Sequence, residues 1–357
     1  MLLAGCAVSP EGDGTSISGG GGRGGESLTP ANDLARFLAG MPGNGSPRLR
    51  KLRDTAEWKA HQQRMDQLWA SFERGYLPHV RSFRGELGGM TSPGVLFYPF
   101  GGPDYLYAHA FFPGASNYVL VGLESADPLP DLAALSDGEI LSSLGGIARS
   151  LQSSLTASYF VTKDMRVDLA SSRFRGTLPL LMVMAARNGQ SIGAAEAVGL
   201  TASGALTSRS AGSGAPGVRV AVGGRNLYYF REDLSDGGGR RVMNFVRSKG
   251  APVTFIKSAS YLMHSGGFSG VRNFILTESR AILQDASGVP YRNLNDSGFR
   301  LTLYGNYSGT LDIFASHGQS DLAEAYRTGS PHPVKPLKFG VGYLRTSSNA
   351  CLIVARK

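Results

Sequence analysis

Three groups of residues have types and spacings that could bind a ligand or catalyse a reaction. The first group comprises Lys257, Ser258, Ser260, Tyr261 and His264, followed by Gln284, Asp285 and Ser287. If residues 254–261 form a strand, Lys257 and Tyr261 lie on one face and the two serines on the other. This alternation would place polar groups along a cleft, with Lys257, Tyr261, His264 and Asp285 as catalytic candidates. A buried Lys257–Asp285 pair would explain the same pattern without a function.

The second group is the turn Gly101-Gly102-Pro103-Asp104 together with Glu124. A glycine-rich turn after a strand, with an acid at the end of the next strand, is typical of nucleotide-binding folds. Gly101, Gly102, Asp104 and Glu124 are therefore ligand-binding candidates. The full G-x-G-x-x-G pattern is missing, and Pro103 lacks an amide donor. The structural alternative is that Asp104 caps a helix.

The third group is Gly189-Gln190-Ser191-Ile192-Gly193, which matches the G-x-S-x-G pattern of hydrolases. In such enzymes the serine lies between a strand and a helix, and an acid and a histidine follow in the chain. The acid would be Asp233, Asp236 or Asp285, and the histidine His264 or His317. Because the chain contains 49 glycines, a five-residue match of this kind arises easily by chance, and a structural role is the alternative.

The histidines and cysteines predict neither a metal site nor a disulfide framework. The six histidines are scattered, without His-x-His, H-E-x-x-H or paired cysteine ligands. Cys351 lies in an apolar run, which predicts a buried small hydrophobe. We expect no metal and no cofactor.

The elements that would position these residues follow from the periodicity. Asp54 and Glu57 predict the start of a helix whose apolar stripe packs on the main body, and Ser136 with Glu139 predicts another. The stripe of the first helix comprises Trp58, His61, Met65, Leu68, Trp69 and Phe72. A strand at 95–98, a helix at 105–112 and a strand at 118–123 predict a β-α-β unit.

Later strands are predicted at 217–230, paired around Gly223-Gly224, and at 253–256. The segments 301–304 with 310–314, and 339–344 with 350–354, read as hairpins. The sequence therefore predicts an α/β or α+β fold with one large mixed β-sheet covered by helices, a Rossmann-like β-α-β opening and C-terminal hairpins. Residues 29–90 form an N-terminal helical segment and residues 91–357 the main domain.

Residues 1–28 read as a truncated signal and a flexible tether. Leu3-Ala4-Gly5-Cys6 resembles the lipobox of bacterial lipoproteins, in which the cysteine carries the lipids. The Gly/Ser-rich residues that follow suit a tether. Only five residues precede Cys6, fewer than a secretory signal needs. Either the true start lies upstream, or the match is accidental and residues 1–28 are a disordered tail. The resemblance implies lipidation at Cys6 and a cell-envelope location, at the outer membrane facing the periplasm or the surface.

The net charge of +9 bears on possible partners. Arg48, Arg50, Lys51 and Arg53 form the densest basic cluster, which could contact an anionic envelope surface. A solvated basic face is the alternative. No interleaving of basic and aromatic residues accompanies the charge, so we expect no nucleic-acid binding.

Three segments resemble a family of uncharacterised bacterial proteins that are often lipoprotein-like. They are residues 98–113 (YPFGGPDYLYAHAFFP), 254–269 (TFIKSASYLMHSGGFS) and 284–291 (QDASGVPY). The resemblance runs from about Val95 to the C-terminus and implies a shared fold, without a known activity.

These observations lead to one main functional hypothesis and two alternatives. The main hypothesis is a lipid-anchored envelope protein with a ligand-binding or structural role. The first alternative is an extracytoplasmic serine-type hydrolase. The second is a Rossmann-like enzyme that binds a nucleotide or S-adenosylmethionine (SAM). Such an enzyme would be cytoplasmic, because these cofactors are supplied in the cytosol. This alternative requires the lipobox match to be accidental.

Overall fold

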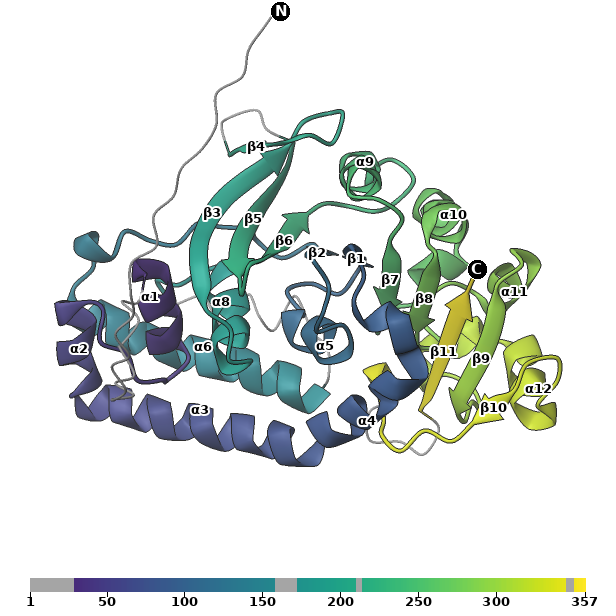
Figure 1. The fold of residues 1–357 in the computed structure, drawn as a ribbon, viewed down its shortest axis with the longest axis horizontal. Helices are drawn as coiled ribbons and strands as arrows, with labels where there is room; N and C mark the ends of the chain where they lie inside the picture. The colour runs from purple at the N-terminus through teal and green to yellow at the C-terminus, as the bar shows by residue number, and fades with distance from the viewer. Residues whose placement is uncertain (1–28, 158–171, 210–213, 345–349) are drawn as a thin grey trace, which may run out of the picture.

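The computed structural model describes residues 29–157, 172–209, 214–344 and 350–357. Over these residues the chain forms an 11-stranded mixed sheet covered by helices, as predicted (Figure 1). The strands are β1 (Val95–Tyr98), β2 (Asn117–Gly122), β3 (Ile192–Leu200), β4 (Leu206–Ser208), β5 (Gly214–Val222), β6 (Arg225–Arg231), β7 (Val253–Ile256), β8 (Ala281–Gln284), β9 (Arg300–Gly305), β10 (Val334–Lys335) and β11 (Cys351–Arg356). Their order is β10-β9-β11-β8-β7-β1-β2-β6-β5-β3-β4.

The centre of the sheet is parallel and doubly wound. From β1 the chain moves to β2 and then β6 on one side, and later returns to β7 and β8 on the other side of β1. The carboxyl ends of these five strands therefore lie along one edge of the sheet. In such sheets ligands bind outside this edge, where the winding reverses.

Antiparallel strands extend the sheet on both sides. β11 is inserted between β8 and β9, antiparallel to each. Beyond β6, the strands β5, β3 and β4 continue as antiparallel neighbours. The run of five adjacent parallel strands thus lies where the functional candidates after β1, β2 and β7 are found, and a short parallel pair of β9 and β10 ends the sheet beyond β11.

Two layers of helices cover the sheet, and the strands alternate between them. Val95 and Phe97 of β1 face one hydrophobic cluster, whereas Leu96 and Tyr98 face the other. The longer helices of the first layer are α1 (Pro30–Leu38), α3 (Ala56–Gly75), α4 (Leu77–Leu87), α5 (Tyr105–Phe111), α6 (Asp137–Ala157) and α8 (Leu178–Arg187). The second layer contains α9 (Arg240–Ser248), α10 (Ser269–Glu278), α11 (Tyr291–Asp296) and α12 (Ser320–Thr328).

The predicted helix starts are confirmed, with one shift in the capping residue. At α6, the Ser136 amide donates to Glu139 Oε2 at 2.9 Å and the Glu139 amide donates to Ser136 Oγ at 3.2 Å, which is the predicted capping box. At α3 the cap is Thr55 rather than Asp54, because Thr55 Oγ1 accepts from the Trp58 amide. The aromatic stripe of α3 is buried against the main body, as expected.

The two C-terminal hairpins predicted from the sequence are wrong. Residues 310–314 are not a strand, because a short 3-10 helix occupies Asp312–His317 and exposes Ile313. Residues 342–344 likewise form a 3-10 helix, and β11 pairs with β8 and β9 instead. Short apolar runs do not distinguish a strand from a single helical turn, and here the partner strands decided the outcome.

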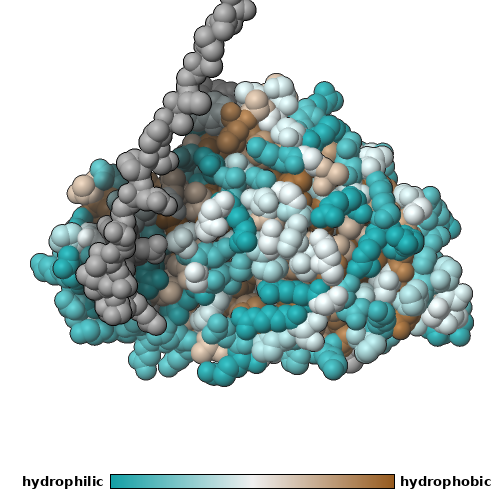
Figure 2. Space-filling model, in the orientation of Figure 1, coloured by the Kyte–Doolittle hydropathy of each residue, from teal (hydrophilic) through white to brown (hydrophobic). Residues whose placement is uncertain are grey.

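The face of the molecule drawn in Figure 2 is largely hydrophilic, with smaller apolar patches between the hydrophilic residues. Within the described residues, no helix combines the length and apolarity that crossing a bilayer would require.

Candidate functional site

A cavity of about 340 Å³ lies at the carboxyl edge of the parallel strands. This volume is in the range of small-molecule sites. Its walls are the segments that follow β1, β2, β6 and β7, together with Tyr343. The lining residues are Phe100, Val121, Gly122, Leu123, Glu124, Glu232, Asp233, Leu234, Ser258, Ala259, Ser260, Leu262, Phe268 and Tyr343. The cavity therefore lies at the reversal point of a doubly wound sheet.

The glycine turn and Glu124 are neighbours, as the sequence suggested, but of these candidates only Glu124 lines the cavity, whereas Gly101, Gly102 and Asp104 do not. Gly102 has a φ of +60°, and a Cβ there would lie 3.1 Å from both carboxylate oxygens of Glu124. A Cβ on Gly122 would overlap the same carboxylate. Tyr229 donates its hydroxyl to Glu124 Oε2 at 3.0 Å. Glycine is thus required at both positions for Glu124 to lie buried against the turn.

Asp104 is fully buried, does not line the cavity and makes structural contacts. Its carboxylate caps α5 by accepting from the Tyr107 amide, and it accepts the Tyr98 hydroxyl at 2.8 Å. Lys257 Nζ lies 2.8 Å from Asp104 Oδ2, and both side chains are 0% exposed. The same Nζ lies 4.1 Å from the centre of the Tyr107 ring. Lys257 therefore pairs with Asp104 rather than Asp285, and this ion pair joins the segments after β1 and β7.

The segment after β7 is a loop and not the predicted continuous strand. β7 ends at Ile256, and Ser258, Ser260 and Tyr261 have φ values of 54°, 51° and 54°. The predicted alternation of faces is therefore wrong beyond residue 256. Ser258 and Ser260 line the main cavity, whereas Tyr261 borders a second, small cavity beside Asp285.

Asp285 and His264 have shifted pKa values. Burial raises the pKa of Asp285, although bonds from Ser287 and the Ser258 amide oppose the shift. Burial lowers the pKa of His264 to about 4, and the neighbouring His317 contributes. His264 packs against Tyr261 with ring centres 5.1 Å apart and does not line the main cavity. Asp285 thus holds the loop after β7 by accepting from the Ser258 amide, whereas His264 lies in the short helix that follows this loop.

Ser191 is not on a nucleophile elbow. It lies between α8 and β3, so the order is helix, turn, strand, the reverse of the elbow. β3 runs in the same direction as β6, which places Ser191 at the amino edge of the sheet. The histidine candidate His264 follows β7 at the opposite edge. The form of the hydrolase hypothesis that uses Ser191 as the nucleophile therefore has no structural basis.

The sequence analysis missed Glu232, Phe100, Phe268 and Tyr343, and it named Asp233 only as a possible acid of a hydrolase triad. The two acids directly follow β6, so the rule that selected Glu124 after β2 could have identified them. Tyr343 gave no such signal, because its segment is distant in sequence and reaches the cavity only through the tertiary fold.

Neither a metal centre nor a reactive thiol is present among the described residues. No group of three metal-ligating side chains occurs in this part of the chain. Cys351 is buried, as predicted, and burial raises the pKa of its thiol to about 12.

The basic cluster is partly committed to internal contacts. Arg53 is buried and pairs with Asp33 at 2.8 Å. Arg48 binds Asp137 at 2.8 Å, which leaves Arg50 and Lys51 as the exposed cations of the cluster. Cys6 lies outside the described residues.

No family model matches the chain, and no curated protein matches it significantly.

Proposed function

We propose that the cavity binds an adenosyl sulfonium compound of the SAM class. The carrying observation is the place of the cavity at the reversal of the doubly wound sheet, where buried Glu124 lines the cavity and the glycine turn packs against the Glu124 carboxylate. This is the arrangement in which such folds bind nucleosides.

Glu124 fits the role of a ribose ligand. Glu124 lies just after the end of β2 and about 20 residues after the glycine turn. This is the usual distance in sequence between such a turn and the acid that binds the ribose hydroxyls. Its carboxylate is 3% exposed and lines the cavity. The Tyr229 hydroxyl fixes its orientation. Because a carboxylate accepts several hydrogen bonds, Glu124 can bind Tyr229 and a ribose hydroxyl together.

The charge of the cavity favours a sulfonium over a phosphorylated nucleotide. Glu124, Glu232 and Asp233 contribute carboxylates, and none of the described lining residues is Lys, Arg or His. Arg241 lies 3.9 Å from Glu232 but does not line the cavity. In a partly desolvated site, carboxylates repel phosphate groups and attract a positively charged sulfur.

Calorimetry on the purified protein with SAM, S-adenosylhomocysteine, ATP and NAD tests this proposal. We expect the two adenosyl compounds to bind at least tenfold more tightly than ATP or NAD. Glu124→Gln should weaken adenosyl binding about tenfold, consistent with the loss of a charge-assisted hydrogen bond. Glu196→Gln, at an exposed carboxylate on β3, is the matched control and should bind normally. Preferential binding of ATP or NAD, or an unaffected Glu124→Gln variant, would refute the proposal.

The proposal has a consequence for location. SAM is a cytosolic cofactor, so a protein that uses it conflicts with an extracytoplasmic anchor at Cys6. If the protein lies in the envelope, the same cavity would take a ligand that is available outside the cytoplasm, for example the nucleoside adenosine. Adenosine therefore belongs in the same titration series.

A further inference from the structure

We infer that the wall of the cavity formed after β7 binds a second ligand, an uncharged aromatic compound that carries a hydroxyl or amide group. The inference rests on the proposed function only for the identity of the first ligand. The two binding regions come from different elements, since Glu124 and Glu232 follow β2 and β6 whereas Ser258 and Ser260 follow β7.

The loop after β7 is rigidly held by side chains from elsewhere in the fold. Three successive amides donate to side-chain oxygens: Ser258 to Asp285 at 2.9 Å, Ala259 to Ser287 at 2.8 Å and Ser260 to Tyr343 at 3.1 Å. The buried Lys257–Asp104 pair fixes the start of the loop. The loop is thus preorganised, which reduces the entropic cost of binding a ligand.

The backbone around this wall is strained. Among the described residues, five other than glycine have positive φ values, and they include Phe100, Ser258, Ser260 and Tyr261. Three of these four line the cavity, and Tyr261 adjoins them. Such conformations cost about 1–3 kcal/mol each and gather at ligand sites when the surrounding structure enforces them. The strain therefore marks this wall as a binding surface.

The chemistry of the wall defines the ligand class. Phe100 and Phe268 meet edge to face with ring centres 5.8 Å apart, and Leu262 extends this apolar surface. Ser260 Oγ and Tyr343 OH lie 2.9 Å apart and both residues line the cavity. An aromatic body fits the first feature, and a neutral hydroxyl or amide fits the second. The nearby carboxylates oppose an anionic ligand, and because none of the residues that form this wall is acidic, a cationic ligand gains no ion pair there.

Benzamide, benzoate and benzylammonium test this inference because they share a shape and differ in charge. Their dissociation constants would be measured by NMR titration of the full chain, with and without saturating S-adenosylhomocysteine. We expect benzamide to bind at least tenfold more tightly than benzoate, and more tightly than benzylammonium. Tyr343→Phe and Ser260→Ala should each weaken benzamide binding at least fivefold. Ser203→Ala, in an exposed turn outside the cavity, is the control.

The outcomes separate the two proposals. If benzamide binds as expected while no adenosyl compound binds, the second site stands and the proposed function fails. The second site is wrong if benzoate binds as tightly as benzamide, if benzylammonium binds most tightly, or if none of the three probes binds. It is also wrong if Tyr343→Phe and Ser260→Ala both bind benzamide normally. If adenosyl compounds still bind in any of these cases, the proposed function stands without the second site. Should Tyr343→Phe fail to fold, as judged by its NMR spectrum, Ser260→Ala alone decides, because its side chain is exposed.

Discussion

Individual histidines illustrate how burial sets ionisation in this protein. His109 and His264 each have a pKa lowered from 6.5 to about 4, mainly because burial disfavours the charged ring. Arg84 and Arg225 add repulsion at His109, and His317 does so at His264. Both rings are therefore neutral in the folded protein at neutral pH.

The lowered histidine pKa values predict a pH dependence of stability. Between about pH 6.5 and 4 the unfolded chain binds these protons and the folded chain does not, so the free energy of unfolding should fall as the pH falls. Each histidine contributes at most about 1.4 kcal/mol per pH unit. Urea denaturation across this range should show a shallower decline for His109→Gln and for His264→Gln.

The exposed His79 provides the control, since His79→Gln should leave the slope unchanged. If all three variants lose stability on acidification just as the original protein does, burial of His109 and His264 is not the cause.

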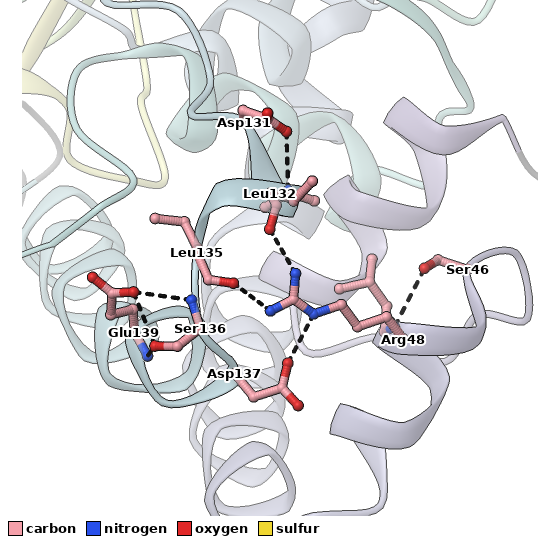
Figure 3. Close-up of polar contacts among 10 residues, drawn as sticks. Ser46, Arg48, Asp131, Leu132, Leu135, Ser136, Asp137 and Glu139 are labelled. Atoms are coloured by element: carbon pink, nitrogen blue, oxygen red, sulfur yellow. Dashed lines mark hydrogen bonds and ion pairs between the residues drawn. The ribbon is translucent and has the colours of Figure 1, made fainter.

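At the scale of elements, one arginine joins the N-terminal helices to the main body. Arg48 on α2 (Pro47–Arg53) donates to Asp137 at 2.8 Å, to the Leu132 carbonyl at 2.6 Å and to the Leu135 carbonyl at 2.5 Å (Figure 3). These acceptors lie at the start of α6, beside the Ser136–Glu139 capping box. A planar guanidinium suits such a set, because its donors point in fixed directions.

Replacing this arginine should loosen the junction between α2 and α6. We expect Arg48→Gln to lower the free energy of unfolding by about 1–2 kcal/mol, because two carbonyls lose charged donors and the partly exposed ion pair adds little. Chemical denaturation measures the change. Arg50→Gln, on the same helix but exposed, should have almost no effect. Equal losses in both variants would show that net charge matters and the contacts do not.

At the scale of the whole molecule, the N-terminal residues predict the cellular compartment. The lipobox-like residues predict that Cys6 carries lipid and that the native protein sediments with membranes, since several acyl chains make a durable anchor. Mass spectrometry of the native N-terminal peptide tests this prediction. Cys6→Ala should release the protein into the soluble fraction, whereas Cys351→Ala should not. An unmodified Cys6 in a cytosolic protein would remove the conflict with SAM binding.

Much of the architecture was predictable because it depends on local patterns. The four apolar residues of β1, the Ser136–Glu139 box and the paired strands around Gly223-Gly224 are encoded within short stretches. The incorrect predictions concern segments whose local structure depends on contacts with residues distant in sequence. Residues 310–314 form a helical turn, and the loop after Ile256 departs from the strand because Asp285, Ser287 and Tyr343 hold its amides.

The sequence by itself determined the mixed α/β class and the proximity of the glycine turn to Glu124, because hydrophobic periodicity and strand ends are local properties. Only the tertiary structure decided that Lys257 pairs with Asp104, that Ser191 lies at the far edge, and that Tyr343 closes the cavity. These relations depend on strand order and direction, which bring together residues that no spacing rule connects.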